Sequence, residues 1–394
     1  MTYRKDLDAL KGIAIIAVVL FHIGLLKSGY LGVDEFFVIN GFLVVPALYK
    51  KIVGGDFSYF GFMEKKMLRL MPLVVVASFV CLLIGFIGML PDNYENLAES
   101  VIASNIFSEN ILSAITTKNY WDVGNDYKPL MHLWYVGILF EFYLILPLLM
   151  MAFKKSFDKL RNRFTNRFED KGMMHFLGVL FVVSLLLYLL PFGKESDKFY
   201  FIQYRMFELL LGGMIGLNIS RIKLNRGGYY SGIQWITNIL LIFVLISSLF
   251  AKDAETGLIQ SKAVLLILTV VLTGVFIIND NAQSKVFNSS LLAYFGKRSY
   301  SIFIWHQVLL AFYRYFVSNQ ITVWFVILLL AVVVGISELS YRFIEQKVSI
   351  SHKSFAGWVI AAILICIPSG WIYLHAGVVR RKSKIISQMM RRMC

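Results

Sequence analysis

The sequence predicts an all-α fold, a polytopic transmembrane helical bundle of ten or eleven spans. Hydrophobic residues make up 58% of the 394-residue chain, and its mean hydropathy is +0.68. Charged residues make up only 16%, against about 25% in a typical soluble domain. Many apolar runs approach or exceed the ~17–20 residues that a helix needs to cross a bilayer, so we expect a multi-pass membrane protein surrounded by lipid.

Eleven apolar runs are candidate spans. They cover residues 11–27, 36–49, 72–90, 132–153, 175–191, 200–218, 231–250, 262–279, 299–317, 321–341 and 355–375. The first run follows Arg4, Lys5 and Lys11, but no small-residue cleavage site follows it. We therefore interpret it as a retained helix rather than a signal peptide. The second run is the shortest, and its assignment as a span is the weakest.

Lys and Arg gather in alternate loops, which is typical of loops on the cytoplasmic side. The basic loops are 50–71, 154–174, 219–230, 280–298 and 342–354, whereas the intervening segment 91–129 is mainly acidic. This alternation predicts a cytoplasmic N-terminus in the inner (cytoplasmic) membrane. It also explains much of the net charge of +15, so nucleic acid is not an expected partner. The basic tail 376–394 departs from the alternation.

Ionisable residues at bilayer depth are costly and are therefore functional candidates. The candidates within or beside apolar runs are His22, Asp34, His132, Glu141, Arg205, Glu208 and His306, the last next to Trp305. A membrane histidine also serves as a simple contact between helices. Arg205 and Glu208 lie three residues apart, a spacing that suits an internal ion pair. No cluster of His, Asp or Glu has metal-ligand spacing, so no metal is expected.

A cationic pair stands at the entry to the third span, in KKMLRLMP, residues 65–72. Lys66 and Arg69 lie about one helical turn apart, where they could hold phosphate groups. Charge that merely sets the topology is the alternative reading of this pair. The outer segment NYWDVGNDY, residues 119–127, mixes aromatic and amide side chains. That composition suits a sugar or an interfacial aromatic belt equally well.

Several motifs together resemble the membrane-bound acyltransferase-3 family of envelope O-acyltransferases. They are RKDLDALKGIAIIAVVLFH (4–22), GYLGVDEFFVINGFLV (29–44), KMLRLMP (66–72), HLWYVGILFEFYLILP (132–147), RMFELLLGG (205–213) and GKRSYSIFIWHQ (296–307). They occur in the family's order and cover roughly residues 3–348. The resemblance implies transfer of an acyl group, usually acetyl, from cytoplasmic acyl-CoA to a sugar hydroxyl outside the membrane. Acetyl-CoA would be a co-substrate, with no bound cofactor, and the acceptor a saccharide of the envelope.

The resemblance also assigns roles to residues. It implies that His22 is the essential histidine and that Lys66 and Arg69 meet the acyl donor. In the mechanism that we expect from these roles, Asp34 orients His22, and His132 is a second catalytic candidate. The remaining motif positions would support the site or bind substrate: Trp134, Glu141, Arg205, Glu208, Trp305 and His306.

Four departures from the family's pattern leave the acceptor open. Lys66 stands where Arg is usual, and Asn40 where Ser precedes the glycine. Leu139 and Phe140 occupy the position of an acidic pair, and Tyr135 replaces Ser. Glu141 falls where Gln is common, so its role also stays open.

The expected organisation is an acyltransferase-3-like transmembrane domain over 1–348, a further helix over 355–375 and a short basic tail over 376–394. Some relatives continue into an extracytoplasmic esterase-like domain. A separate esterase-like or transferase partner is therefore expected as one alternative. A proton-coupled transporter of sugars or lipid-linked sugars is the rival function, since buried His, Glu and Arg suit it as well. A third reading is a non-catalytic subunit that passes acyl groups to a separate transferase.

Overall fold

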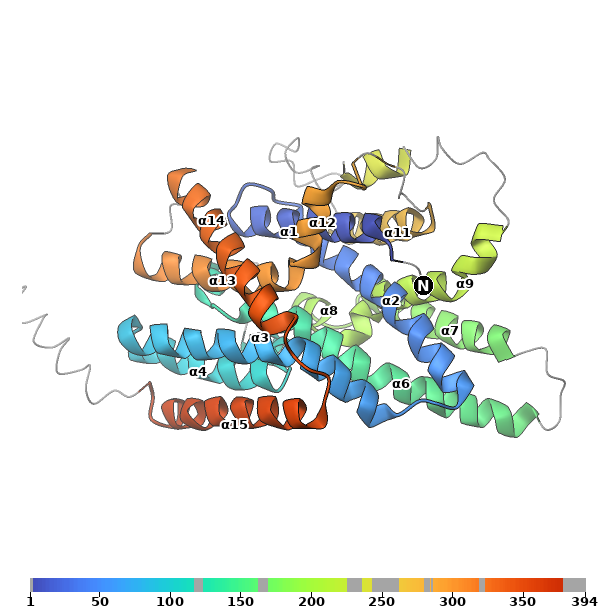
Figure 1. Cartoon of the computed structure of the whole chain (residues 1–394), viewed down its shortest axis with the longest axis horizontal. Coiled ribbons are helices and arrows are strands. Elements are labelled where there is room, and N and C mark those ends of the chain that lie inside the picture. Colours follow the sequence, from blue (N-terminus) through green and yellow to red (C-terminus); the bar gives the residue numbers. More distant parts are fainter. Residues whose placement is uncertain are drawn as a thin grey trace, which may run out of the picture. The chain divides into compact units, whose positions relative to one another are not determined.

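The computed structural model describes residues 3–116, 123–161, 169–224, 236–242, 262–279, 284, 286–318 and 323–377. Within these ranges all regular secondary structure is helical, which confirms the expected fold class (Figure 1). The chain divides into two compact units. Unit 1 comprises Met1–Tyr59 and Glu141–Phe303, and unit 2 comprises Phe60–Phe140 and Ile304–Cys394.

Unit 1 contains the N-terminal helices and the central third of the chain. Its main helices are α1 (Lys5–His22), α2 (Gly32–Gly54), α7 (Glu169–Leu189), α8 (Glu195–Tyr200), α9 (Ile202–Leu224), α11 (Lys262–Asn279) and α12 (Ser290–Lys297), with the short turn η1 (Gly29–Leu31) before α2. Most of α6 (Trp134–Arg161) also belongs to it. Its apolar core includes Ile39, Phe207, Phe276 and Phe287, all nearly or fully buried.

Unit 2 contains the remaining helices. They are α3 (Tyr59–Gly88), α4 (Pro91–Asn105), α5 (Glu109–Thr116), most of α13 (Ser299–Phe316), α14 (Val323–Ser340) and α15 (His352–Leu374), with short turns η2 (Val123–Tyr127) and η3 (Met131–Leu133) and a π-helical turn η8 (Tyr341–Glu345). Within this unit α4 and α15 pack along each other, as Figure 1 shows.

Every expected span except 231–250 coincides with a described helix. Of that span only residues 236–242 are described, and they are helical. In the described part of the chain, seven helical segments are long and apolar enough to cross a membrane. They are Gly29–Gly54, Tyr59–Gly88, Met131–Asp158, Lys171–Leu189, Lys262–Asn279, Trp324–Glu345 and His352–Leu374. The protein is therefore a multi-pass membrane protein.

The second span is longer than its sequence pattern suggested. The apolar run predicted residues 36–49, but α2 covers Gly32–Gly54. Asp34 and Glu35 lie in its first turn, where negative charge favours the helix N-terminus. Asp34 is therefore part of the span rather than a residue that precedes it.

Several sequence features lie outside the described residues. They are residues 119–122 of the outer aromatic segment, 162–168 and 225–230 of the basic loops, 280–283 and Lys285 of a further basic loop, and 378–394 of the basic tail. Residues 231–235 and 243–250, the two ends of the expected span 231–250, also lie outside the described residues.

Small residues let the helices of unit 1 approach closely. A Cβ on Gly41 of α2 would overlap the carbonyl oxygen of Leu209, and one on Gly212 of α9 would overlap that of Val38. At the other face of α2, a Cβ on Gly32 would come 2.5 Å from the carbonyl oxygen of Ala14. Close backbone contact of this kind is the usual way that membrane helices associate, because lipid removes the hydrophobic drive between them. The α2 helix is thereby fixed against both α1 and α9.

Candidate functional site

A buried acid–guanidinium cluster links α2 and α9 in unit 1. Arg205 Nη1 donates to Asp34 Oδ1 and to Glu208 Oε1, each at 2.8 Å. All three side chains are almost fully buried, at most 4% exposed. The expected i,i+3 ion pair between Arg205 and Glu208 is thus present, and it is joined by an acid 171 residues away in sequence.

Aromatic groups and a backbone carbonyl surround the guanidinium. Arg205 Nε donates to the carbonyl oxygen of Phe199 at 3.3 Å, and the Phe199 ring lies 5.0 Å from its Cζ. Tyr30 and Tyr188 both lie close enough to interact electrostatically with Asp34 and Arg205. A buried cation needs this many partners because an unpaired one would be very costly.

His22 ends α1 at the edge of unit 1. Its ring is partly exposed and meets Phe21 edge-on, with the centroids 5.1 Å apart. Phe21 in turn packs against Tyr30, next to the acid cluster. The hydrogen bonds that the structure gives to the Asp34 side chain go to the α9 group rather than to His22. Asp34 is therefore placed to fix Arg205, and its expected role of orienting His22 stays a prediction.

Asn40 has a structural role in α2. Its side-chain nitrogen donates to the carbonyl oxygen of Phe36, one turn earlier, at 2.9 Å. Asn40 stands where the resembling family usually has Ser. This hydrogen bond from the Asn40 side-chain amide to its own helix gives a polar group a partner in an otherwise apolar segment.

Two histidines meet in the interior of unit 2. The rings of His132 and His306 lie 5.7 Å apart in a T-shaped arrangement, and both residues are at most 2% exposed. His132 comes from η3 at the start of α6, and His306 from α13. The sequence identified both residues separately, and the fold brings them together across 174 positions of the chain.

Tryptophans flank the histidine pair along the chain. Trp305 Nε1 donates to Ser340 Oγ of α14 at 2.7 Å. Trp134 is 3% exposed and meets Tyr135 edge-on at 6.4 Å. Glu141 lies further along α6 and is only partly buried. Trp305 thus connects α13 to α14 beside His306, and no sequence motif pointed to the serine that it contacts.

Lys66 and Arg69 lie one turn apart on α3, as expected. Lys66 is partly buried, with its amino nitrogen 5.4 Å from the Phe62 ring centroid, whereas Arg69 is exposed. The acid two residues before Lys66, Glu64, pairs with His352 Nδ1 at 3.0 Å. Arg69 makes no ion pair among the residues that the structure describes. The pair thus presents positive charge that an anionic ligand can use.

A further buried acid, Glu109, lies in unit 2, outside the candidate spans. Glu109 accepts hydrogen bonds from Ser100 Oγ at 2.8 Å and from Ser104 Oγ at 3.3 Å. Burial raises the pKa of the Glu109 carboxyl well above its usual range, although both serines act in the opposite direction. The sequence placed Glu109 in an acidic outer segment and gave no sign that it is buried.

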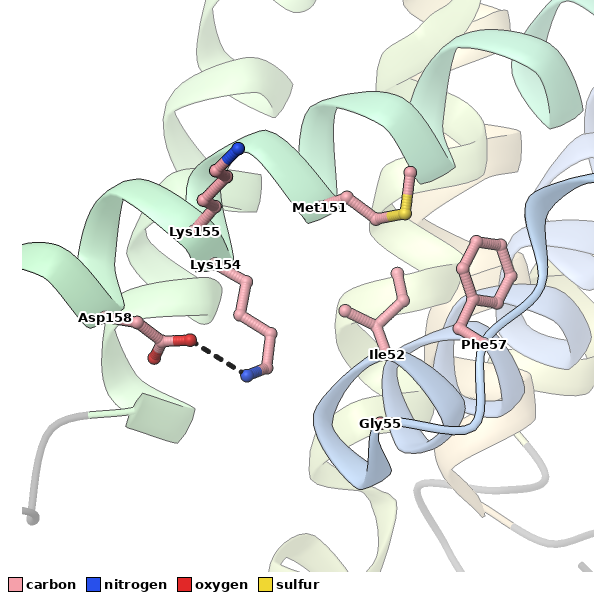
Figure 2. Close-up of a pocket in the computed structure, with 7 residues that line it drawn as sticks. All are labelled: Ile52, Gly55, Phe57, Met151, Lys154, Lys155 and Asp158. Atoms are coloured by element: carbon pink, nitrogen blue, oxygen red, sulfur yellow. Dashed lines mark hydrogen bonds and ion pairs between the residues drawn. The ribbon is translucent and has the colours of Figure 1, made fainter.

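A pocket of about 540 Å³ opens in unit 1 between the end of α2 and the basic end of α6 (Figure 2). Its lining combines apolar and charged side chains: Ile52, Gly55, Phe57, Met151, Lys154, Lys155 and Asp158. Figure 2 shows the Lys154 amino group bonded to Asp158, at 3.0 Å. The pocket is lined by two cations, Lys154 and Lys155, and the charge of Lys154 is therefore already balanced by Asp158.

In the described ranges, no group of three or more His, Cys, Asp or Glu side chains is arranged to hold a metal ion. Among the described residues, the family motifs contribute the acid–guanidinium cluster, the histidine pair and the cationic pair on α3.

Apolar helices that carry buried acids, an arginine and paired histidines define a multi-pass membrane protein with polar sites inside its helical units. The chain belongs to the acyltransferase-3 family, whose sequence model, described as "Acyltransferase domain", matches residues 4–342. This confirms the family resemblance that the motifs suggested.

Two curated relatives illustrate the family. "Putative O-acetyltransferase SAS0844" of Staphylococcus aureus strain MSSA476 is 29% identical over 357 residues, covering 88% of this chain and 57% of the relative. "O-acetyltransferase OatA" of Staphylococcus aureus strain MRSA252 is 26% identical over 403 residues, covering 93% of this chain and 62% of the relative. The chain thus matches less than two thirds of the length of either relative. No solved structure matches the chain at a significant level.

Proposed function

We propose that the protein is an O-acyltransferase that moves an acyl group, most simply acetyl, from cytoplasmic acyl-CoA to a hydroxyl of an envelope saccharide. The observation that carries the proposal is the family match across residues 4–342, together with relatives named O-acetyltransferases. In this proposal the N-terminus lies in the cytoplasm and the protein in the inner membrane, in keeping with the basic loops.

Each polar site has a part in the proposed reaction. Lys66 and Arg69 hold the phosphates of the acyl donor by charge. His22, partly exposed at the end of α1, takes the proton of the acceptor hydroxyl as its oxygen attacks the thioester carbon. The C–O bond forms, the C–S bond breaks, and the CoA thiolate gains a proton. A relay through an acyl-histidine is the alternative route to the same product.

The remaining residues support these steps. The Asp34–Arg205–Glu208 cluster holds α9 against α2, so that these two helices keep their relative position during the reaction. His132 and His306 provide a pair of imidazoles in unit 2 in addition to His22. Trp134, Glu141 and Trp305 lie along the same helices. A separate extracytoplasmic esterase-like or transferase partner belongs to the third reading, in which the protein only passes acyl groups onward.

The test is acetyl transfer by the purified protein in vesicles, with labelled acetyl-CoA outside and a saccharide acceptor inside. We expect labelled acceptor with the wild-type protein and a loss of about 10²- to 10⁴-fold for His22→Ala, the range of general-base catalysis. Phe21→Leu, at the neighbouring position, is the matched control and should keep most of the activity. Full activity of a correctly inserted His22→Ala variant would remove His22 from the mechanism.

A proton-coupled transporter is the second candidate, favoured by the buried Asp34, Arg205 and Glu208 side chains of unit 1. A transporter would move saccharide across the vesicle membrane with a proton and would produce no labelled ester. The third reading is a non-catalytic subunit that only passes acyl groups onward. Such a subunit would produce labelled ester in the vesicle assay only when neighbouring gene products, including its partner transferase, are added.

A further inference from the structure

A carboxyl group that no motif assigns lies next to the acid cluster of unit 1. Glu35 follows Asp34 in the first turn of α2 and is fully buried, at 0% exposure. Neither of its carboxyl oxygens has a hydrogen-bond partner among the described residues. Buried polar groups in proteins are almost always hydrogen-bonded, so such a carboxyl requires an explanation.

Among the described residues, no cation acts on Glu35 to neutralise its carboxylate. The charged group that acts on Glu35 is Asp34, which has the same sign. The nearest cation of the cluster, Arg205, already donates to two other carboxyls and to the carbonyl of Phe199. Asp34 and Glu208 thus share the one guanidinium, whereas Glu35 lies beside the like charge of Asp34. A buried charge that lacks a partner is avoided by taking up a proton.

The helices around α2 leave Glu35 little freedom to turn toward water. Gly32, three residues before Glu35, is in close contact with the backbone of α1, and Gly41 is in close contact with the backbone of α9. The titratable groups that line the helices packed on this end of α2 are Asp34, Tyr30 of η1, His22 of α1, Tyr188 of α7, and Arg205 and Glu208 of α9. Arg205 is the one permanent cation in that set.

We propose that Glu35 is held as a neutral carboxylic acid and is a proton-exchange site within the membrane-spanning part of unit 1. The carboxyl gives up its proton to a neighbouring titratable group and regains it from one, and the charge that it carries in between is tolerated only briefly. This makes Glu35 a proton-positioning residue of the helical unit rather than a ligand of the acyl donor.

The exchange has a use in acyl transfer, a consequence that rests on the proposed function. The acceptor hydroxyl loses a proton when its O–H bond breaks, and the CoA thiolate needs one when the C–S bond breaks. Both events occur at the same thioester carbon in the proposed reaction, so one proton has to pass from the hydroxyl to the departing sulfur. A carboxylic acid at bilayer depth can protonate the thiolate and be reprotonated by the imidazolium that took the hydroxyl proton, so that protons balance over one turnover.

Infrared spectroscopy of the resting protein in lipid tests the protonation state directly. A carboxylic acid without hydrogen bonds has its carbonyl band at the high-frequency end of the carboxyl region. We expect this band at neutral pH in the wild-type protein, a downshift in D₂O as its proton exchanges, and its loss in Glu35→Gln. Glu338→Gln is the matched control, because Glu338 is paired with Arg342 and should contribute no such band.

Two results would overturn the proposal. One is a wild-type spectrum without the band at neutral pH, which does not depend on whether any variant folds. The other is a band that survives in Glu35→Gln or that never shifts in D₂O.

The catalytic consequence is read separately from turnover. Glu35→Gln should lower kcat about 10²-fold, the lower end of the range for proton-transfer groups, with KM for acetyl-CoA unchanged. Equal kcat at every pH would sink the role in transfer. If the wild-type protein transfers no acetyl group at all, the proposed function fails, while the infrared result still decides the state of Glu35.

Discussion

Arg205 Nη1 lies 2.8 Å from Asp34 Oδ1, although 171 residues separate the two in sequence. The contact joins the second span to a helix from the middle of the chain, in a place where neither side chain reaches water. Because the same nitrogen also meets Glu208, removal of Arg205 leaves several carboxyls without a counter-charge.

Arg205→Ala should therefore lower the free energy of unfolding by about 3–5 kcal/mol, the range for breaking a buried ion pair from one side. Reversible unfolding in mixed detergent measures it. Lys154→Ala removes a more exposed ion pair in the same unit and should cost no more than about 1 kcal/mol. Equal losses for the two variants would contradict the burial argument.

Close helix contact makes a second prediction. Gly212→Ala places a Cβ on the Val38 carbonyl oxygen, and since backbone cannot move aside easily, we expect a loss of about 1–3 kcal/mol, as for overpacked cores. Gly335→Ala is the control, since nothing lies within 4 Å of its Cβ position. There the substitution should stabilise α14 by about 0.5–1 kcal/mol through helix propensity. A neutral Gly212→Ala would show that α2 and α9 are not in backbone contact.

The histidine pair of unit 2 can be tested by a double-mutant cycle. His132→Ala, His306→Ala and the double variant should give a coupling of about 0.5–1.5 kcal/mol in unfolding, as for other edge-to-face ring pairs. His132 and His175 make the control cycle, because His175 lies exposed on α7 and should be uncoupled. Additivity in the first cycle would argue against the ring contact.

Glu109 predicts a pH dependence of stability. Its folded-state pKa is raised by burial above the unfolded value of about 4.3. The folded protein therefore holds a proton that the unfolded chain releases, and stability falls as pH rises from the unfolded pKa toward the folded one. The melting temperature of the wild-type protein should fall between pH 5 and pH 8 relative to that of Glu109→Gln, which keeps the shape without the titration. Parallel melting curves across that range would count against a raised pKa.

The cationic pair on α3 should act on acyl-donor affinity. Arg69→Ala is expected to raise KM for acetyl-CoA about tenfold or more, because charge-assisted bonds to phosphate contribute roughly 1.5–3 kcal/mol each. Lys65→Ala, exposed on the same helix, is the matched control and should change KM little. Lys66→Arg restores the bidentate group that is usual in the family and should lower KM or leave it unchanged. An unaltered KM in Arg69→Ala would separate this pair from the donor.

The sequence predicted the helical class, and helices lie at most of the predicted span positions, seven of which are long and apolar enough to cross a membrane in the described part of the chain. It underestimated the second span, since Asp34 and Glu35 interrupt the apolar run that α2 includes. It singled out His132 and His306, but their meeting depends on helix packing that no local pattern encodes.

The partners of the site residues were harder to foresee. Ser340 and the serines around Glu109 are small polar residues of ordinary sequence context, and only the fold shows what they contact. Glu35 is an acid inside the mainly apolar run VDEFFV, a pattern that indicates a buried carboxyl, but the family motif points to the neighbouring Asp34.

The contact of α1 with α12 also constrains the order in which the protein is made. A Cβ on Gly12 would overlap the carbonyl oxygen of Leu292, one on Gly296 would overlap that of Asp8, and Arg4 reaches the carbonyl of Ile277, 273 residues later. At about 5–20 residues per second, the ribosome needs about 15–55 s to supply that partner. Throughout that interval the first helix, with its buried Asp6, lacks the partner against which it packs, so its final packing can form only late in synthesis.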